Sequence, residues 1–254
     1  MLAGLYISYA VFRAWLNPSI APKPAAEEIP PTAVIMKEVL VSFLPLFSLI
    51  ILVLGTILAG IATPAEAAAV GAFGSLVLSY FYKTLKWKNF KESVFLTAKT
   101  TAMIMWLFIG SWTFASVFSY LGGHEVFEHF FKSFNLQPWQ FLVITQLIIF
   151  LLGWPLEWVP IVMIIIPIIL PLVEALGFNL TWFAILVAVN LQTAWLSPPV
   201  ALSAYFLKGV VPEWDLKDIY LGMMQFMVLQ IIGLIIIIIF PKIVLWLPTV
   251  LYGQ

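Results

Sequence analysis

Long stretches without charged residues divide the chain into apolar segments. Asp, Glu, Lys and Arg are missing from 39–65, 100–124, 133–156, 175–207 and 219–241. A helix that crosses the hydrocarbon core of a membrane needs roughly 17–25 mostly apolar residues, so each stretch is long enough to contain one. The pattern predicts uninterrupted spanning helices at 39–60, 64–82, 92–121 and 219–246.

The apolar segment 139–176 is interrupted near its middle. The sequence GWPLE at 153–157 separates two arms of roughly 13–18 residues, which are too short to cross a membrane comfortably. We expect a re-entrant helical hairpin whose tip, at 153–157, lies at membrane depth. A plain loop between two short, tilted helices is the alternative.

The apolar segment 181–209 is interrupted by two consecutive prolines. Proline has no backbone N–H, and it pushes the residue before it out of the α region. Ser197, Pro198 and Pro199 therefore predict a discontinuous helix, with its break well inside the charge-free stretch. The alternative is a kinked helix in which Ser and Thr side chains satisfy the freed backbone groups.

Composition restricts the class of protein. Of the 254 residues, 63% are hydrophobic and 9% are charged, whereas soluble domains carry about 25% charged residues. These values exclude a soluble enzyme, a nucleic-acid-binding protein and a disordered linker. Twelve basic and twelve acidic residues leave no net charge to attract nucleic acid. The absence of cysteine excludes disulfides, thiolate metal sites and cysteine nucleophiles.

Basic residues in the short loops predict the topology of the chain. Lys83, Lys86, Lys88 and Lys91 form the densest positive cluster, so this loop is expected in the cytoplasm. The segment 122–138 and the C-terminus then lie on the outer side. The first fifteen residues, MLAGLYISYAVFRAW, lack the features of a signal peptide and are interpreted as the end of a spanning helix. We therefore expect the chain to be a fragment of a longer protein.

The sequence GIATPAEAAAVG contains a helix-start motif. Thr63 and Glu66 have the spacing of a capping box, and Pro64 occupies the first helical position. The small residues that follow, up to Gly71, suit close packing of helices. We favour a structural role, while a buried Glu66 on a transport pathway or at an interface is the alternative.

Neutral oxygens are concentrated at the two predicted interruptions. A broken helix leaves backbone carbonyls unpaired, and such carbonyls suit Na⁺. Uncharged side-chain oxygens are added by Asn190, Gln192, Thr193 and Ser197. Glu157 is the only charge in the turn that begins at Gly153. No catalytic Ser-His-Asp pattern, phosphate loop or HExxH motif is present, so we expect no enzyme. The two histidines, His124 and His129, are expected on an ordinary surface.

Three blocks together resemble a known family of transporters. They are GIATPAEAAAVGAFGSLVLSY, LLGWPLEWVPIVMIIIPIILPLVEALGF and VAVNLQTAWLSPPVALSAYFLKGVVPEW, followed by DIYLGMMQFMVLQIIGL. Their order and spacing are similar to the C-terminal half or more of the large membrane (permease) subunit of tripartite ATP-independent periplasmic (TRAP) transporters. The details look most like the branch labelled for mannitol or chloroaromatic compounds.

The resemblance implies the fold class and the activity. The fold would be an all-α polytopic membrane protein, the second inverted repeat of an elevator-type transporter, with a re-entrant helical hairpin and a discontinuous helix. The activity would be Na⁺-coupled import of an organic acid, without ATP, across the bacterial inner membrane. A periplasmic substrate-binding protein would deliver the acid, and a small TRAP membrane subunit would pair with the large one. Na⁺ would be the coupling ion, with no other cofactor and no nucleic-acid partner.

The resemblance also implies an organisation and a set of site residues. The expected order is the end of a transmembrane helix in 1–16, a cytoplasmic loop in 17–37, scaffold-type transmembrane helices in 38–121, a periplasmic amphipathic segment in 122–138, the hairpin in 139–176, the discontinuous helix in 178–210 and a C-terminal transmembrane helix in 211–254. The expected Na⁺-binding residues are Gly153, Glu157, Gln192, Thr193, Ser197 and Pro198. The expected structural positions are Thr63, Pro64, Glu66, Gly71 and Pro199.

Two positions depart from the pattern that is frequent in this family. Glu157 stands where the family often has Asp, and Ser197 stands where it often has Thr. The first repeat of such a transporter would lie upstream of Met1, so the chain alone is not expected to transport. The sequence does not identify a substrate. A different Na⁺-coupled carboxylate carrier, a membrane scaffold subunit and a membrane-embedded enzyme are the alternatives.

Overall fold

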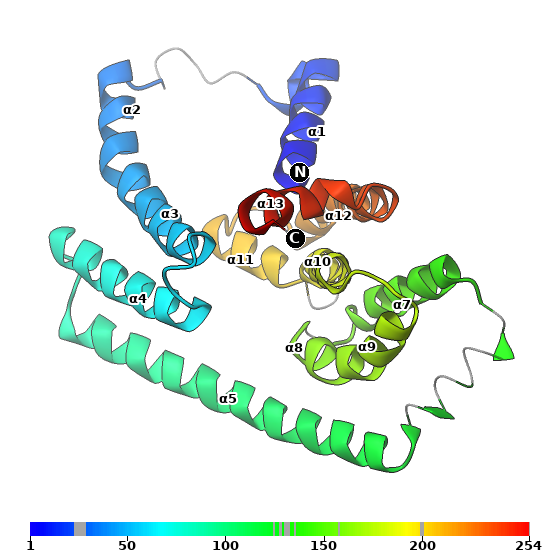
Figure 1. Ribbon diagram of the computed structural model, residues 1–254. Coiled ribbons are helices and arrows are strands. Elements are labelled where there is room, and N and C mark those ends of the chain that lie inside the picture. Colours follow the sequence, from blue (N-terminus) through cyan, green and yellow to red (C-terminus); the bar gives the residue numbers. More distant parts are fainter. Residues whose placement is uncertain are drawn as a thin grey trace. The chain divides into compact units, whose positions relative to one another are not determined.

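The computed structural model describes residues 1–22, 29–123, 125–126, 129, 133–134, 136–156, 158–198 and 201–253. Within these ranges all regular elements are helices, which confirms the expected all-α class (Figure 1). Five helices in the described ranges are long and apolar enough to cross a membrane. They are Thr32–Leu58, Pro64–Phe81, Trp87–Tyr120, Trp158–Ala175 and Leu216–Ile239. The chain divides into two compact units, one of residues 19–101 and one of residues 1–18 and 102–254.

The unit of residues 19–101 is built around two packed helices, α3 and α4. Its elements are the end of η1 (Pro18–Ile20), α2 (Thr32–Glu38), the π-helical turn η3 (Val39–Phe43), α3 (Leu44–Leu58), α4 (Pro64–Phe81) and the first part of α5 (Trp87–Tyr120). The helix α2 thus begins at Thr32, inside the range 17–37 where a loop was expected. From Thr32 the helix runs without a gap through η3 into α3, whose first turn contains Pro45.

Close approach of α3 and α4 depends on glycine. A Cβ added to Gly71 would lie 3.1 Å from Val53 Cγ2, and one added to Gly74 would lie 2.4 Å from Leu49 Cδ1. The start of α4 carries the capping box, in which Glu66 N donates to Thr63 Oγ1 (3.4 Å) and Thr63 N donates to Glu66 Oε2 (2.8 Å). Pro64 is the first residue of α4, where its missing N–H costs nothing. Glu66 itself is exposed.

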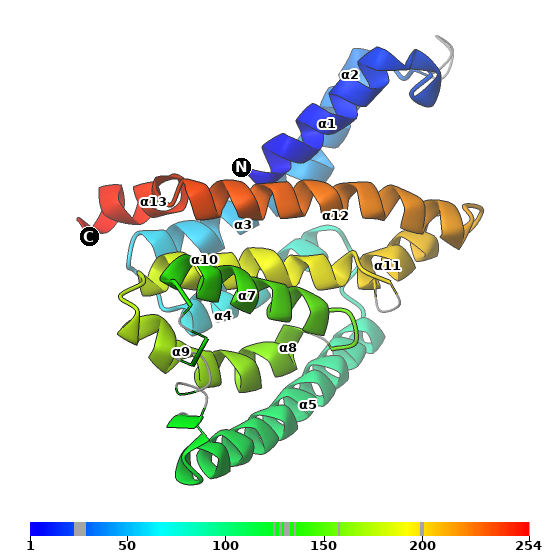
Figure 2. The same cartoon turned by 90° about the vertical axis from the view of Figure 1, so that its right-hand side faces the viewer.

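The second unit contains the remaining helices. They are α1 (Leu2–Leu16), the rest of α5, α7 (Pro138–Leu152), α8 (Trp158–Pro160), the π-helical turn η4 (Ile161–Ile165), α9 (Ile166–Ala175), α10 (Leu180–Leu191), the 3-10 turn η5 (Gln192–Trp195), α11 (Leu202–Val210), α12 (Leu216–Ile239) and α13 (Lys242–Tyr252). Helix α1 packs against α12, and α10 contacts α7, α12 and α13 (Figure 2).

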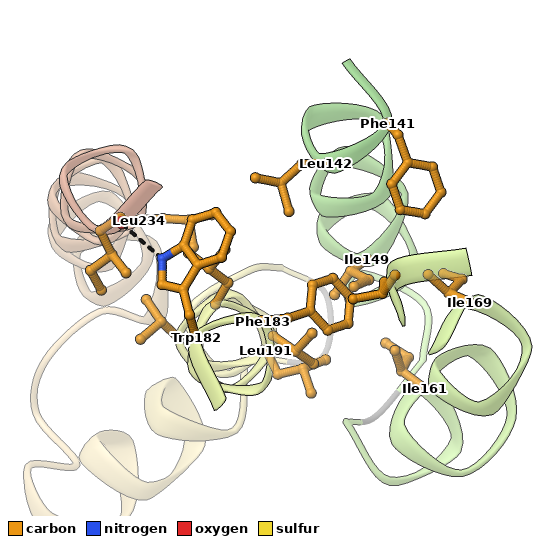
Figure 3. Packing of buried hydrophobic residues seen from close by; sticks show 14 of the residues in the cluster. Phe141, Leu142, Ile149, Ile161, Ile169, Trp182, Phe183, Leu191 and Leu234 are labelled. Atoms are coloured by element: carbon orange, nitrogen blue, oxygen red, sulfur yellow. Dashed lines mark hydrogen bonds between the residues drawn. The ribbon is translucent and has the colours of Figure 1, made fainter. Parts of the chain in front are cut away.

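Helix α10 is the centre of this unit's core. It is apolar on all sides, which is typical of a helix surrounded by protein. Phe183 is almost fully buried and packs with Ile149 and Ile161, while Trp182 Nε1 donates to the carbonyl of Ile237 at 3.0 Å (Figure 3). The buried indole therefore has the hydrogen-bond partner that it needs.

The expected single helix at 219–246 is wrong, because the structure divides it. Helix α12 ends at Ile239, and α13 begins at Lys242. Phe240, between them, has φ −122° and ψ 72°, outside the α region. The cause is Pro241, whose ring restricts the residue before it. The sequence prediction did not take Pro241 into account, because the apolar pattern of the preceding isoleucine run continues on both sides of it.

Candidate functional site

The candidate site lies where α10 ends. The helix begins at Leu180, after the N-cap residue Asn179, whose Oδ1 accepts from Trp182 N at 2.9 Å, and it ends at Leu191. The chain then tightens into η5, and α11 begins only at Leu202. Because the last four carbonyls of a helix have no partner within it, the carbonyls at this interruption need donors from elsewhere in the buried core.

Two hydroxyl groups serve the carbonyls at this interruption. Thr193 Oγ1 donates to the carbonyl of Asn190 at 2.7 Å, and Ser197 Oγ donates to the carbonyl of Thr193 at 2.6 Å. Both side chains are buried. The two hydroxyl protons therefore satisfy backbone carbonyls of the same segment, as expected for a kinked helix. The lone pairs of the hydroxyl oxygens stay available to a cation.

An amide from α7 reaches the last turn of α10. Asn190 Nδ2 donates to both the backbone carbonyl of Gln146 (2.7 Å) and its Oε1 (2.9 Å). Asn190 Oδ1 and Gln146 Nε2 are also buried, and neither has a hydrogen-bond partner among the described residues. Unpaired buried polar atoms each cost about 1–3 kcal/mol, so the core holds unused donor and acceptor capacity here.

A second amide approaches the same turn from α12. Gln230 is fully buried, and its Nε2 donates to the carbonyl of Val189 at 2.8 Å and to Gln192 Oε1 at 3.0 Å. Gln230 Oε1 accepts from the hydroxyl of Tyr6 on α1. The end of α10 is therefore held between an amide of α7 and an amide of α12.

The turn after α7 lies against the turn after α10. A Cβ added to Gly153 would lie 3.2 Å from the Cβ of Ala194. Ala194 is in η5 and is buried. The structure thus brings together Gly153 and the segment that carries Gln192, Thr193 and Ser197.

Comparison with known proteins identifies the family. The model described as "Tripartite ATP-independent periplasmic transporter, DctM component" matches residues 1–243. The chain belongs to this family of TRAP transporter large permeases. The resemblance noted in the sequence is confirmed, and with five helices capable of crossing a membrane among the described residues the chain is a multi-pass membrane protein. The mannitol or chloroaromatic branch stays a prediction.

Several curated TRAP permeases are similar to this chain. The C4-dicarboxylate TRAP transporter large permease protein DctM of Rhodobacter capsulatus is 28% identical over 204 residues, which are 80% of this chain and 46% of the relative. The sialic acid TRAP transporter large permease protein SiaM of Vibrio cholerae is 27% identical over 209 residues, 80% of this chain and 48% of the relative. A putative TRAP transporter large permease protein of Haemophilus influenzae is 27% identical over 247 residues, 96% of this chain and 59% of the relative. The chain spans about half the length of the curated relatives it matches.

The TRAP permease chain offers neutral oxygens at this place. Gln192 is exposed, Pro198 is half-buried, and Thr193 and Ser197 are buried on the same short segment. Glu157 and Pro199 lie outside the described residues. Among the residues that are described, no three His, Cys, Asp or Glu side chains gather as a metal site. Hard cations such as Na⁺ fit carbonyl and hydroxyl oxygens, whereas transition metals prefer imidazole or thiolate.

A hollow beside the permease's interruption is apolar. Its volume is about 480 Å³, and it lies between α8, η4 and α9 on one side and α10 and η5 on the other. Gln192 and Trp195 belong to its lining, so η5 contacts this hollow as well as the buried polar side chains around the end of α10.

The sequence did not lead us to three residues whose side chains surround the end of α10: Gln146, Gln230 and Tyr6. The two glutamines stand in apolar runs, and a polar side chain at membrane depth usually has a function. That signal was present in the sequence, although it does not show which partners the amides meet. Thr63 and Glu66 belong to the other unit, at the start of α4. His124 lies outside the described residues.

Proposed function

We propose that this chain forms the part of a TRAP permease that carries one Na⁺ site, at the end of α10. The permease would couple the inward flow of Na⁺ to import of an organic acid. The observation that carries the proposal is the buried cluster of neutral oxygens at an interrupted helix, in a chain that matches the DctM family model over 1–243. Interrupted helices present free carbonyls to coupling ions in many secondary transporters.

The candidate ligands are those that lie on, or face, the interruption. Thr193 and Ser197 supply buried hydroxyl oxygens, and Gly153 supplies the backbone of the neighbouring turn. Gln192, Glu157 and Pro198 complete the set proposed from the sequence. We propose that 139–176 forms a re-entrant hairpin and 178–210 a discontinuous helix of an elevator-type inverted repeat.

The named relatives support an organic acid as the substrate class. The substrates in their names are C4-dicarboxylate, sialic acid and, for a permease of Oleidesulfovibrio alaskensis, isethionate. All three are acids that are anionic at neutral pH. We propose that a periplasmic binding protein delivers such an acid, and that a small membrane subunit pairs with the permease in the bacterial inner membrane.

Uptake by proteoliposomes tests this proposal. The transporter that contains this chain is reconstituted with a small membrane subunit and a binding protein, and uptake of a labelled organic acid is measured with Na⁺ or K⁺ outside. Uptake should require Na⁺, and Thr193→Ala and Ser197→Ala should raise the Na⁺ concentration for half-maximal uptake about tenfold, because each removes a ligand oxygen worth about 1.4 kcal/mol.

Thr249→Ala is the matched control for these variants. Thr249 Oγ1 donates to the carbonyl of Leu245 at 2.8 Å, a bond of the same kind as that of Thr193, but on exposed α13. The control should keep the Na⁺ dependence of the unmodified transporter. Equal uptake in Na⁺ and K⁺ would contradict Na⁺ coupling. An unchanged Na⁺ requirement in both site variants would contradict the proposed ligands.

A further inference from the structure

A directed chain of hydrogen bonds connects α1 to the end of α10. Its central residue is Gln230, which is fully buried on α12. The two groups on its Nε2 side, the carbonyl of Val189 and Gln192 Oε1, are both acceptors. The NH₂ group of Gln230 must therefore face them, which leaves its Oε1 facing Tyr6 and makes the tyrosine hydroxyl the donor.

We propose that Gln230 is a positioning residue for the Na⁺ site, and that Tyr6 makes Na⁺ affinity depend on the docking of α1 against α12. The inference rests on the proposed function, because it assigns two further residues to the same site. Neither residue touches the ion. Gln230 holds a backbone carbonyl of the last turn of α10 and the side-chain oxygen of Gln192, and Tyr6 holds Gln230 in the orientation that does so.

The energetic argument starts from the burial of Gln230. Without the Tyr6 hydroxyl, Gln230 Oε1 would be a buried acceptor with no donor, at a cost of about 1–3 kcal/mol. The amide would lower this cost by turning, and turning removes its NH₂ group from Val189 and Gln192. The oxygens at the interruption would then lose their fixed positions, and a cation site depends on oxygens held in place before the ion arrives.

The surface between α1 and α12 holds Tyr6 in reach of Gln230. The ring of Phe226 packs edge-on against Tyr6 at 5.3 Å and against Tyr9 at 5.9 Å. Further along, a Cβ added to Gly233 would lie 2.6 Å from Leu2 Cδ2. Docking of α1 thus uses apolar contacts, and the Tyr6 bond adds a polar connection that reaches the core.

The same surface contains a matched control. Tyr9 OH donates to Gln225 Oε1 at 2.5 Å, and Arg13 adds a bond to the same oxygen at 3.0 Å. This second tyrosine–glutamine pair joins the same two helices, but it is exposed, and its described bonds do not reach α10. Removing its hydroxyl likewise takes a tyrosine–glutamine hydrogen bond from the α1–α12 contact, together with the bond that Arg13 donates to that hydroxyl, and it leaves the route to the site intact.

The absence of cysteine from the chain provides a direct readout. A Trp195→Cys variant carries its only thiol on η5, at a position where the tryptophan side chain is 41% exposed. The reaction rate of this thiol with a maleimide reports the state of the interruption. The full chain is placed in lipid nanodiscs, and the labelling rate is titrated with NaCl at constant ionic strength maintained with KCl.

We expect Na⁺ to change the labelling rate in this reference protein. Adding Tyr6→Phe should raise the Na⁺ concentration of the half-maximal change about three- to tenfold, the effect of losing one hydrogen bond of about 0.6–1.4 kcal/mol. Adding Tyr9→Phe should leave it unchanged. Gln230→Met should raise it at least as much as Tyr6→Phe, and Gln225→Met should not.

The outcomes separate the inference from the function on which it rests. If the reference protein shows no response to Na⁺, the Na⁺ site is wrong and the inference falls with it. If the reference responds but Tyr6→Phe and Tyr9→Phe shift the midpoint equally, the site stands and the connection through Gln230 is wrong. Tyr6→Phe removes a single oxygen atom, so it carries the test even if Gln230→Met fails to fold.

Discussion

Gly153 and Ala194 lie so close that a methyl group on the glycine would stand 3.2 Å from the methyl group of the alanine. The two residues belong to different interruptions of the chain, the turn after α7 and the 3-10 turn after α10. Forty residues separate them in sequence, so only the packing of α7 against α10 brings them together. A small side chain at both positions is what allows this contact.

Gly153→Ala should therefore destabilise the protein. The added methyl group needs a shift of a few tenths of an ångström at Ala194, and overpacking of this kind costs about 1–3 kcal/mol. The free energy of unfolding in detergent micelles measures the effect. Gly222→Ala is the control, since the described residues leave open space around Gly222 within α12 and alanine favours a helix there.

The double variant Gly153→Ala, Ala194→Gly makes the prediction specific. Removing the alanine methyl group removes the contact at 3.2 Å and leaves the carbonyl oxygens of Phe150 at 3.3 Å and Ile149 at 3.4 Å, so the double variant should be more stable than the sum of the two single effects predicts. If the two effects simply add, the contact between the turns does not determine the cost of the methyl group.

Asn190→Leu alone should lower the free energy of unfolding more than Asn190→Leu combined with Gln146→Met. The single change leaves Gln146 Oε1 buried without its donor, which costs about 1–3 kcal/mol. The double change removes both amides, including the two atoms that lack partners among the described residues. Unfolding of the two single variants and the double variant measures the coupling. A double variant as unstable as the summed single variants would contradict the pairing.

Thr63→Ala should loosen the first turn of α4. The change removes the oxygen that accepts from Glu66 N, and losing such a cap costs about 1 kcal/mol. Amide hydrogen exchange of residues 65–67 should become faster. Ser75→Ala serves as the control, because Ser75 Oγ only donates to the carbonyl of Ala72 within the same helix. Equal acceleration of 65–67 in both variants would show that the cap is not the cause.

Pro241→Ala should join α12 and α13 into one helix. Without the proline ring, Phe240 is free to return to the α region, and residue 241 regains an N–H to donate. Amide exchange at Lys242 and Ile243 should slow. Pro248→Ala, inside α13, should leave the junction as it is, since the chain is already helical on both sides of that proline. Unchanged exchange at the junction would mean that packing, and not Pro241, ends α12.

Much of the fold follows from local properties of the sequence. Charge-free stretches of sufficient length predict helices because a membrane excludes unpaired backbone groups. The spacing of Thr63 and Glu66 predicts a capping box, and the structure contains it. Pro241 was an equally local signal, and it was overlooked only because isoleucine dominates the residues before it.

The partners of the buried amides could not be predicted in this way. Gln225 and Gln230 stand five residues apart in the same apolar run, and nothing local distinguishes them. One is exposed and the other fully buried, because their side chains leave α12 in different directions. The pairing of Gln146 with Asn190 spans 44 positions. Such contacts depend on how the helices pack, which a periodic pattern does not specify.

The length of α5 locates the surface of the membrane on this chain. Its 34 residues form a rod about 51 Å long, whereas the hydrocarbon layer is about 30 Å thick. The charge-free part, 100–120, accounts for about 31 Å and fills that layer on its own. The remaining part, 87–99, contains Lys88 and Glu92, which form an exposed ion pair at 3.9 Å. We therefore expect the lipid boundary near Lys99, with residues 87–99 extending about 20 Å beyond it.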